Sequence, residues 1–282
     1  SIVLAGVALL IINLAPRYGL AAGIMALLIA SAGLYRVMGL LMFGAAVLTW
    51  LAPEPEVAGA NVAPCTLYDA FTVPFQEFFS RKGAISILPL IVLYKLGDAF
   101  AGALSTTFLI RGAGFSPEVV GSVNKILAVV ATIVGALIGG GIMGKLGLYR
   151  SLMLFGLLQA LSNLMYMLIA LHPQNLPLMA LGVGFENLCG GLGTAAFVAL
   201  LMALCHVQFT ASQFALLSAL SAVGRVFVAG PLTPPIVEAY GWPAFFVFTF
   251  FIALPGLLVL WFMRAEIKAL EKDPSPEPET GI

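Results

Sequence analysis

Long apolar runs recur along most of the 282 residues and are separated by short polar connections. The runs do not alternate every second residue, as strands of a membrane β-barrel would. Their lengths instead match helices of roughly 20 residues that cross a bilayer. The pattern predicts an all-α integral membrane protein with helices at 1–15, 20–52, 86–110, 117–144, 151–171, 178–205, 212–237 and 243–263.

The second run, 20–52, is longer than one crossing requires. As a helix it would extend about 50 Å, so it either forms one tilted or protruding helix or breaks near Gly33. Capping chemistry marks the start of two later runs. Ser116 precedes a proline and a glutamate, and Thr210 stands three residues before Gln213 in the spacing of a capping box.

Two polar segments have different predicted structures. In residues 66–82, phenylalanines recur at helical spacing with charges between them, which predicts a helix on the membrane interface that is interrupted near Pro74. The end of the chain contains DPSPEPET, a proline-rich acidic sequence. We therefore expect 264–282 to be a disordered cytoplasmic tail.

Basic residues are distributed unequally between alternate connections. One side has only Arg17 and Arg111, whereas the other has Arg81, Lys82, Lys145, Arg150, Arg264, Lys268 and Lys272. By the positive-inside rule, the 53–85 loop, the 145–150 turn and the tail are cytoplasmic.

The composition supports a membrane protein and excludes several functions. Hydrophobic residues make up 61% of the chain and charged residues 9%, and the mean hydropathy is +1.06. Thirteen basic and thirteen acidic side chains cancel, so no overall charge favours nucleic acid. The sequence lacks zinc-protease, serine-nucleophile, Walker and Rossmann motifs, so we expect no enzyme, no metal and no resident cofactor. Helix packing is the predicted role of Cys65, Cys189 and Cys205.

Five ionisable residues lie inside the predicted spans, namely Lys95, Asp98, Lys125, Glu186 and Arg225. Each costs about 2.5–3.5 kcal/mol at the centre of a bilayer on insertion scales. They must therefore face one another, water or a ligand. Their sum is one positive charge, which favours an anionic substrate.

Lys95 and Asp98 are three residues apart on one predicted helix, with Tyr94 one turn before Asp98. One interpretation is a buried structural ion pair. The other is a protonatable carboxylate beside a cation in a transport pathway, where binding of an anion would change the proton affinity of the carboxylate.

Amides and glycines accompany the other charges. Asn124 precedes Lys125, while Gln159 and Asn163 are four residues apart and suit either interhelical hydrogen bonds or a polar pathway. Glu186 and Asn187 precede the glycines 190, 191 and 193, which permit either a loosened helix or close helix packing. Two small-x-x-x-small motifs, 135–139 and 140–144, predict packing faces. Arg225 is expected to pair with a carboxylate of Glu186 or of a ligand.

Four blocks carry a resemblance to a known family: LAPEPE at 51–56, the segment from VLYKLGDAF to ATIVGALIGG at 92–140, FENLCGGLGTAAFVALLMALC at 185–205, and SQFALLSALSAVGRVFVAGP at 212–231. Over about residues 50–265 the chain resembles the AmpG-like anhydromuropeptide permeases of the major facilitator superfamily.

The resemblance implies a domain organisation. Residues 86–263 would form the carboxy-terminal six-helix bundle, 53–85 the cytoplasmic loop between bundles, and 1–52 the last two helices of an amino-terminal bundle. About four further helices would precede Ser1, which stands inside an apolar run without a signal-peptide pattern. We accordingly expect the chain to be a fragment.

The resemblance also implies a function. Such permeases use the proton gradient to import N-acetylglucosaminyl-anhydro-N-acetylmuramyl peptides across the bacterial inner membrane for cell-wall recycling, which affects β-lactamase induction in some species. An anionic sugar peptide would then contact candidate residues Tyr94, Lys95, Asp98, Asn124, Lys125, Gln159, Asn163, Glu186, Asn187 and Arg225. Alternatives are a carrier for another sugar, acyl-CoA or organic anion, a membrane enzyme, and a receptor. Nothing in the sequence indicates an oligomeric state.

Overall fold

The computed structural model describes residues 33, 35–40, 42–48, 51, 67–81, 83–206 and 209–272. The chain divides into two compact units, Ser1–Ala58 and Gly59–Ile282. In the first unit, an apolar helix covers Tyr35–Leu48, inside the predicted run 20–52. The predicted helix 1–15 and Cys65 lie outside the described residues.

All regular elements in the described part of the second unit are helices. Its elements are α2 (Leu67–Ser80), α3 (Ala84–Thr107), η1 (Phe108–Gly112), α4 (Pro117–Val123), η2 (Asn124–Ala128), α5 (Val129–Leu146), α6 (Leu148–Leu171), α7 (Leu176–Leu204), α8 (Thr210–Val223), η4 (Gly224–Ala229), α9 (Gly230–Phe262) and α10 (Arg264–Lys272). The η elements are short π-helical segments that continue the neighbouring α-helices.

Five helical stretches of the described chain are long and apolar enough to cross a membrane: Ala84–Gly112, Pro117–Leu146, Leu148–Leu171, Leu176–Leu204 and Thr210–Phe262. The last has 53 residues, about 80 Å as a straight helix, which is far more than one crossing needs. Gly241 divides it, because its backbone angles of φ 77° and ψ 171° are not helical. The all-α membrane fold is therefore confirmed.

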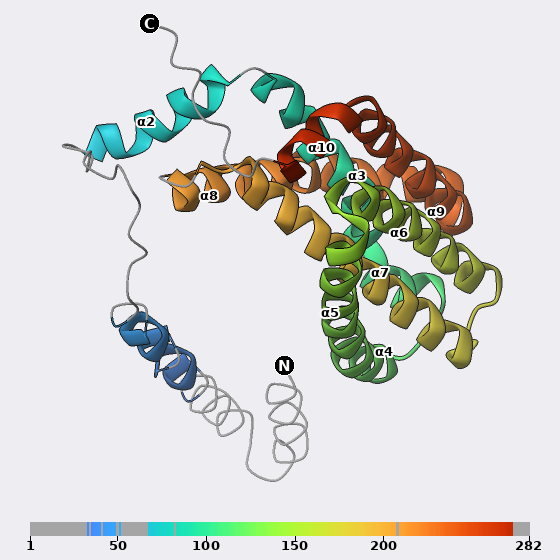
Figure 1. The fold of residues 1–282 in the computed structure, drawn as a ribbon. Helices are drawn as coiled ribbons and strands as arrows, with labels where there is room; N and C mark the ends of the chain where they lie inside the picture. The colour runs from blue at the N-terminus through green and yellow to red at the C-terminus, as the bar shows by residue number, and fades with distance from the viewer. Residues whose placement is uncertain are drawn as a thin grey trace, which may run out of the picture. The chain divides into compact units, whose positions relative to one another are not determined.

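Close helix packing in the bundle depends on small residues. Gly97 and Gly256 bring α3 and α9 together, because a Cβ on either would collide with Ala253 or with the Leu93 carbonyl. Gly135 and Gly139 pack in the same way against Leu188 and Leu192 of α7, as the first small-residue motif predicted. Figure 1 shows α3, α5, α6, α7 and α9 as the main helices of this bundle.

The second small-residue motif is not a packing face within the described part of this bundle. No atom of the described chain lies within 4 Å of a Cβ built on Gly140 or Gly144. These two residues follow the Gly135–Gly139 face by five positions, which turns them about 140° around the helix axis from it. Among the described residues the motif at 140–144 therefore has no packing partner, and its role as a packing face stays a prediction.

Two buried hydrophobic clusters form the core. One includes Phe155, Leu200 and Leu260, and the other includes Phe100 and Phe245. On α3 the first cluster ends at Tyr94 and the second begins at Ala99, and corresponding gaps separate the clusters on α6 and α7. The bundle therefore has a layer between its two cores.

The predicted helix starts had different outcomes. Ser116 caps α4, and its side chain accepts a hydrogen bond from Val119 N, as predicted. The capping box at Thr210 was wrong, because α8 has no side-chain cap and Gln213 directs its amide toward other partners.

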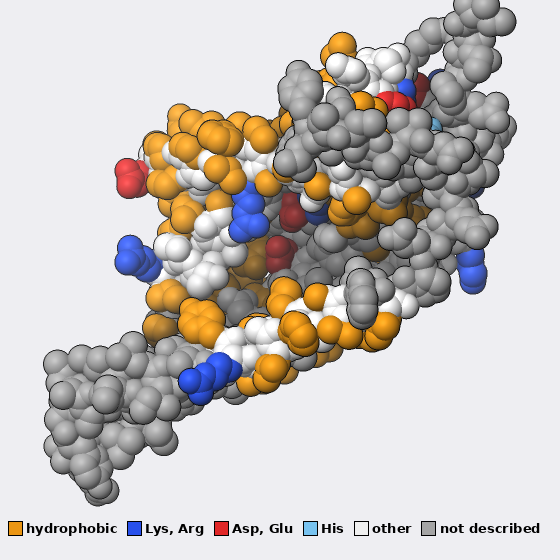
Figure 2. Space-filling model, turned by 90° about the vertical axis from the view of Figure 1, so that its left-hand side faces the viewer, with side chains coloured by type: hydrophobic (Ala, Val, Ile, Leu, Met, Phe, Trp, Pro, Cys, Tyr) orange, Lys and Arg blue, Asp and Glu red, His pale blue; other side chains and the backbone are white. Residues whose placement is uncertain are grey.

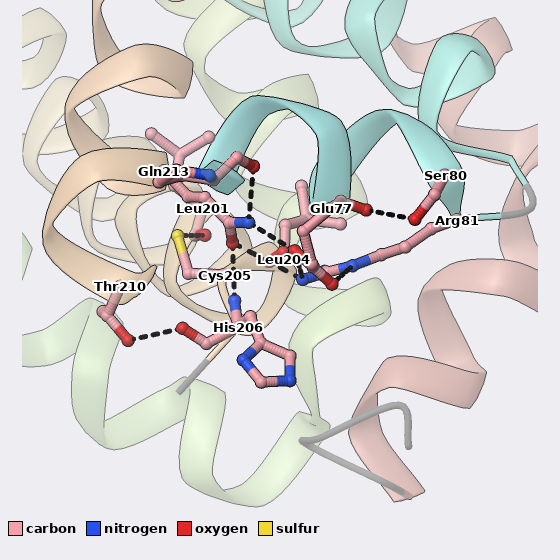
Figure 3. Close-up of polar contacts among 10 residues, drawn as sticks. Glu77, Ser80, Arg81, Leu201, Leu204, Cys205, His206, Thr210 and Gln213 are labelled. Atoms are coloured by element: carbon pink, nitrogen blue, oxygen red, sulfur yellow. Dashed lines mark hydrogen bonds and ion pairs between the residues drawn. The ribbon is translucent and has the colours of Figure 1, made fainter. Parts of the chain in front are cut away.

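Those partners belong to α2 and to the end of α7 (Figure 3). Gln213 is only 1% exposed, and its Nε2 donates to Pro74 O at 3.1 Å and to Glu77 Oε2 at 2.5 Å. Its Oε1 accepts from His206 N at 2.7 Å. Arg81 forms a bidentate ion pair with Glu77 and donates to Leu204 O at 2.7 Å.

These contacts also explain α2 itself. The helix continues through Pro74, so the predicted interruption was wrong. Proline removes one backbone donor, but Phe78 is 1% exposed in the core and Gln213 holds the Pro74 carbonyl, which together fix the helix. Its location on the membrane interface stays a prediction.

The start of the tail is ordered, contrary to the prediction for 264–282. Residues Arg264–Lys272 form α10, whose Ile267 is fully buried. Glu271 accepts a hydrogen bond from Tyr149 N at 2.8 Å, so a carboxylate from α10 stabilises the N-terminus of α6. The prediction of disorder followed the acidic, proline-rich sequence at the end of the chain and overlooked the amphipathic pattern of RAEIKALEK.

Candidate functional site

Lys95 and Asp98 form an ion pair on α3. Lys95 Nζ lies 3.3 Å from Asp98 Oδ2, and the two side chains are 17% and 30% exposed. The same ammonium lies 3.3 Å from Thr194 Oγ1 of α7 and 5.5 Å from the centre of the Phe197 ring. Lys95 therefore links α3 to α7 through both a hydroxyl and an aromatic face.

Tyr94 lies beside this pair, but its own contacts hold the helices together. Its hydroxyl donates to Leu152 O at 3.0 Å, and its ring stacks on Phe197 with 5.6 Å between centroids. The side chain is buried in the first core cluster. Tyr94 thereby fixes the orientation of α3 against α6 and α7.

Glu186 lies in a second polar group on α7. Its Oε2 accepts a hydrogen bond from Asn187 Nδ2 at 2.8 Å and one from the Tyr166 hydroxyl at 3.5 Å. Asn187 Nδ2 also donates to Val183 O, while its Oδ1 accepts from Thr132 Oγ1 at 3.4 Å. The carboxylate of Glu186 is thus positioned by neutral donors.

The two groups are near each other. Asp98 lies close enough to Glu186 and to Tyr166 for its charge to act on both. Figure 2 shows acidic and basic side chains close together among hydrophobic ones on the face drawn. Lys95 and Glu186 therefore belong to one electrostatic cluster centred on Asp98.

Gln159 and Asn163 of α6 line the same cavity as Asp98. The cavity is small and lies between α3, α6 and α9, and Tyr94 also lines it. Their side chains are 6% and 1% exposed, and neither Gln159 Nε2 nor Asn163 Nδ2 has a hydrogen-bond partner in the described chain. The predicted interhelical hydrogen bonds of these two donors are absent.

The positions of these residues within the fold explain why they gather. Lys95 and Asp98 on α3, Gln159 and Asn163 on α6, and Glu186 on α7 all lie between the two hydrophobic clusters. The polar side chains thus occupy one layer near the middle of the spans. Charges at such depth are expensive and are typical of functional sites.

No contact among the described residues brings three of the candidates, Arg225, Asn124 and Lys125, into this cluster. Arg225 is exposed and makes no ion pair there, so the predicted pair with Glu186 was wrong. Glu186 has its partners on α6 and α7 instead. Asn124 is half-buried in η2, and Lys125 follows it there, with its side chain outside the description.

Asn124, Lys125 and Arg225 share a backbone feature that sequence patterns did not predict. The first two begin or lie in η2, and Arg225 lies in η4. A π-helical turn adds one residue to the helix and often occurs at functional positions. Both segments replace the smooth α-helices expected there.

Glycines of α7 bring its neighbours close without interrupting it. The helix is continuous from Leu176 to Leu204, so these residues serve close packing and do not loosen the chain. A Cβ on Gly191 would collide with the Thr132 carbonyl of α5, and one on Gly193 would meet Gln159 Oε1 at 2.5 Å.

Sequence reasoning missed Thr132, Tyr166 and Thr194. Each is a hydroxyl residue inside an apolar run, where such residues often bond within their own helix. The available signal was spacing: Tyr166 lies three residues after Asn163, and Thr194 lies seven after Asn187, which puts each near the helix face of the earlier residue.

Membrane-length helices around a layer of charged and amide side chains are typical of membrane transporters. The sequence model of one protein family, the Major Facilitator Superfamily, matches residues 70–282. The chain therefore belongs to the Major Facilitator Superfamily. It is a multi-pass protein of the bacterial inner membrane.

Several curated proteins are similar to the chain. The anhydromuropeptide permease of Escherichia coli K12 is 52% identical over 236 residues, which cover 84% of this chain and 48% of the permease. The putative transporter AmpG 4 of Rickettsia conorii is 32% identical over 69% of this chain and 46% of that protein. An uncharacterised Haemophilus influenzae protein is 39% identical over 79% of this chain and 54% of that protein. The chain thus spans about half the length of these relatives.

Proposed function

We propose that the chain forms the carboxy-terminal half of a proton-coupled carrier that imports anhydromuropeptides from periplasm to cytoplasm for cell-wall recycling. The similarity to the Escherichia coli permease supports the substrate class. The observation that carries the proposal is the Lys95–Asp98–Glu186 cluster at mid-depth in the bundle. The carrier would draw on the proton gradient and need no resident cofactor.

In this proposal Lys95 binds a carboxylate of the peptide. Among the described residues, its ammonium lies near one acidic group, that of Asp98, and one hydroxyl, that of Thr194. A substrate carboxylate that approached Lys95 would compete with Asp98 for it, and the released Asp98 would take up a proton more readily. Substrate binding and protonation would thereby be coupled through one ammonium group.

Glu186 is the second proposed coupling group. Its hydrogen bonds come from Tyr166 and Asn187, both neutral donors, and it is subject to the negative charge of Asp98. Two carboxylates near each other disfavour double ionisation. We therefore propose that Asp98 and Glu186 share the coupled proton, while Asn124, Lys125 and Arg225 contact the substrate from η2 and η4.

Uptake by the full-length carrier in right-side-out vesicles tests this function. Labelled N-acetylglucosaminyl-anhydro-N-acetylmuramyl tripeptide should accumulate when a proton gradient is imposed, and a protonophore should abolish accumulation. Unlabelled muropeptide should compete, whereas other sugars, acyl-CoA and simple organic anions should not. Competition by one of those solutes alone would favour the alternative carrier, and binding without accumulation would favour a receptor.

A further inference from the structure

The cavity between α3, α6 and α9 is a site in its own right. Tyr94 and Asp98 of α3 line it, as do Gln159 and Asn163 of α6, while α9 contributes an apolar wall with Ala253 and Leu257. Its volume is about 10 Å³, near the roughly 10–15 Å³ that one water molecule requires. Four polar side chains thus surround a space of the size of one small molecule.

Two of these side chains have unused hydrogen-bond donors. Gln159 Nε2 and Asn163 Nδ2 are deeply buried and have no acceptor within the described protein. Buried amide groups in native proteins nearly always find a partner, either in the protein or in ordered water. Both donors belong to residues of the same cavity wall, so one bound acceptor can satisfy both.

The lining determines which ligand fits. Two N–H donors disfavour a cation, and the carboxylate of Asp98 disfavours an anion. A molecule that accepts two hydrogen bonds and donates others matches the site, because Asp98 supplies a carboxylate acceptor. The Tyr94 oxygen can also accept, since its own proton is donated to Leu152 O.

We propose that this cavity binds one water molecule, which accepts hydrogen bonds from Gln159 Nε2 and Asn163 Nδ2 and donates to Asp98. The water is then a second partner of Asp98, in addition to Lys95. Asp98 then keeps a hydrogen-bond partner when its ion pair with Lys95 opens. Only this last consequence rests on the proposed transport function.

Radiolytic footprinting of the full-length carrier in nanodiscs tests the water site. A synchrotron pulse generates hydroxyl radicals from bound water, which oxidise the side chains next to it. Tyr94, which lines the cavity, should be oxidised well above Phe155, which is fully buried on α6 and does not line it. Exposed Tyr240 provides the positive control. Equal oxidation of Tyr94 and Phe155 would overturn the proposal.

A variant identifies the groups that hold the water. In the double variant Gln159→Leu, Asn163→Leu, oxidation of Tyr94 should fall to the level of Phe155, while that of Tyr240 stays unchanged. Unchanged oxidation of Tyr94 in the folded variant would contradict the proposal. If the variant does not fold, the wild-type comparison still decides. Absence of muropeptide uptake would refute the proposed function without altering these readouts.

Discussion

Lys95 Nζ lies 3.3 Å from Asp98 Oδ2 and also 3.3 Å from Thr194 Oγ1. The ammonium is therefore shared between a carboxylate on its own helix and a hydroxyl on α7. The hydroxyl satisfies a further proton of the partly buried ammonium, as a buried ion pair requires. Through Thr194 the pair contacts α7, the helix that also carries Glu186 of the electrostatic cluster.

Energetic coupling between Lys95 and Asp98 can be measured with a double-mutant cycle. Lys95→Met or Asp98→Asn alone should lower the free energy of unfolding by about 1–3 kcal/mol, because each leaves a partly buried charge without its partner. The double variant should cost less than the sum, with an interaction energy of roughly 0.5–3 kcal/mol. Thermal unfolding of the purified carrier provides the measurement, and additive losses would show that the pair is uncoupled.

Two neighbouring glycines of α7 should respond differently to alanine. Gly191→Ala places a Cβ against the Thr132 carbonyl, which is backbone and cannot rotate away, so we expect a loss of about 1–3 kcal/mol. Gly190→Ala is the matched control, because its Cβ would lie 3.8 Å from Gln159 Nε2 in ordinary contact. Equal thermal unfolding midpoints of the two variants would contradict the close α5–α7 packing.

Gln213 should be important for stability although it belongs to no transport site. Gln213→Leu removes the partners of His206 N, Pro74 O and Glu77, and should cost about 1–3 kcal/mol. Limited proteolysis near α2 should become faster in the variant. Ser218→Ala on α8 is a suitable control, because Ser218 is exposed and its side chain takes no part in these contacts, so the variant should melt like the wild type.

The same cluster predicts a dependence of stability on pH. Burial raises the pKa of Glu77, but hydrogen bonds from Arg81 and Gln213 and the charge of Arg81 outweigh it, so the pKa lies below its ordinary value. The stabilisation is then fully present above the pKa of the unfolded chain, about 4.3, and is lost as the pH falls through the folded-state pKa.

A comparison with Glu77→Gln tests the direction of this dependence of stability on pH. The wild type should melt at a higher temperature than the variant near neutral pH, and the difference should shrink as the pH falls below about 4.3. A difference that widened with acidification would mean that the pKa of Glu77 is raised in the folded protein.

The fold could be predicted because the bilayer limits the possible structures. Apolar runs of about 20 residues leave few alternatives to spanning helices, and the runs from 86 to 263 match α3 to α9 closely. The pair between Lys95 and Asp98 was also predictable, because a spacing of three residues on one helix determines their proximity.

Contacts between helices were less predictable. Arg225 was expected to pair with Glu186 or with a ligand carboxylate, yet Tyr166 and Asn187 are the hydrogen-bond donors that reach Glu186. Gln213 fitted a local capping motif, whereas its partners on α2 lie more than 130 residues away in sequence. Such partners depend on how helices rotate and pack, which local patterns do not specify.

Transport by variants of the central cluster tests the account most directly. Proton-driven accumulation of labelled anhydromuropeptide should be lost in Asp98→Asn and in Glu186→Gln of the full-length carrier, because neither variant retains both ionisable groups. Glu238→Gln, which changes an exposed carboxylate on α9, should accumulate substrate like the wild type. Normal accumulation by both cluster variants would contradict the claim that this mid-depth cluster couples protons to substrate.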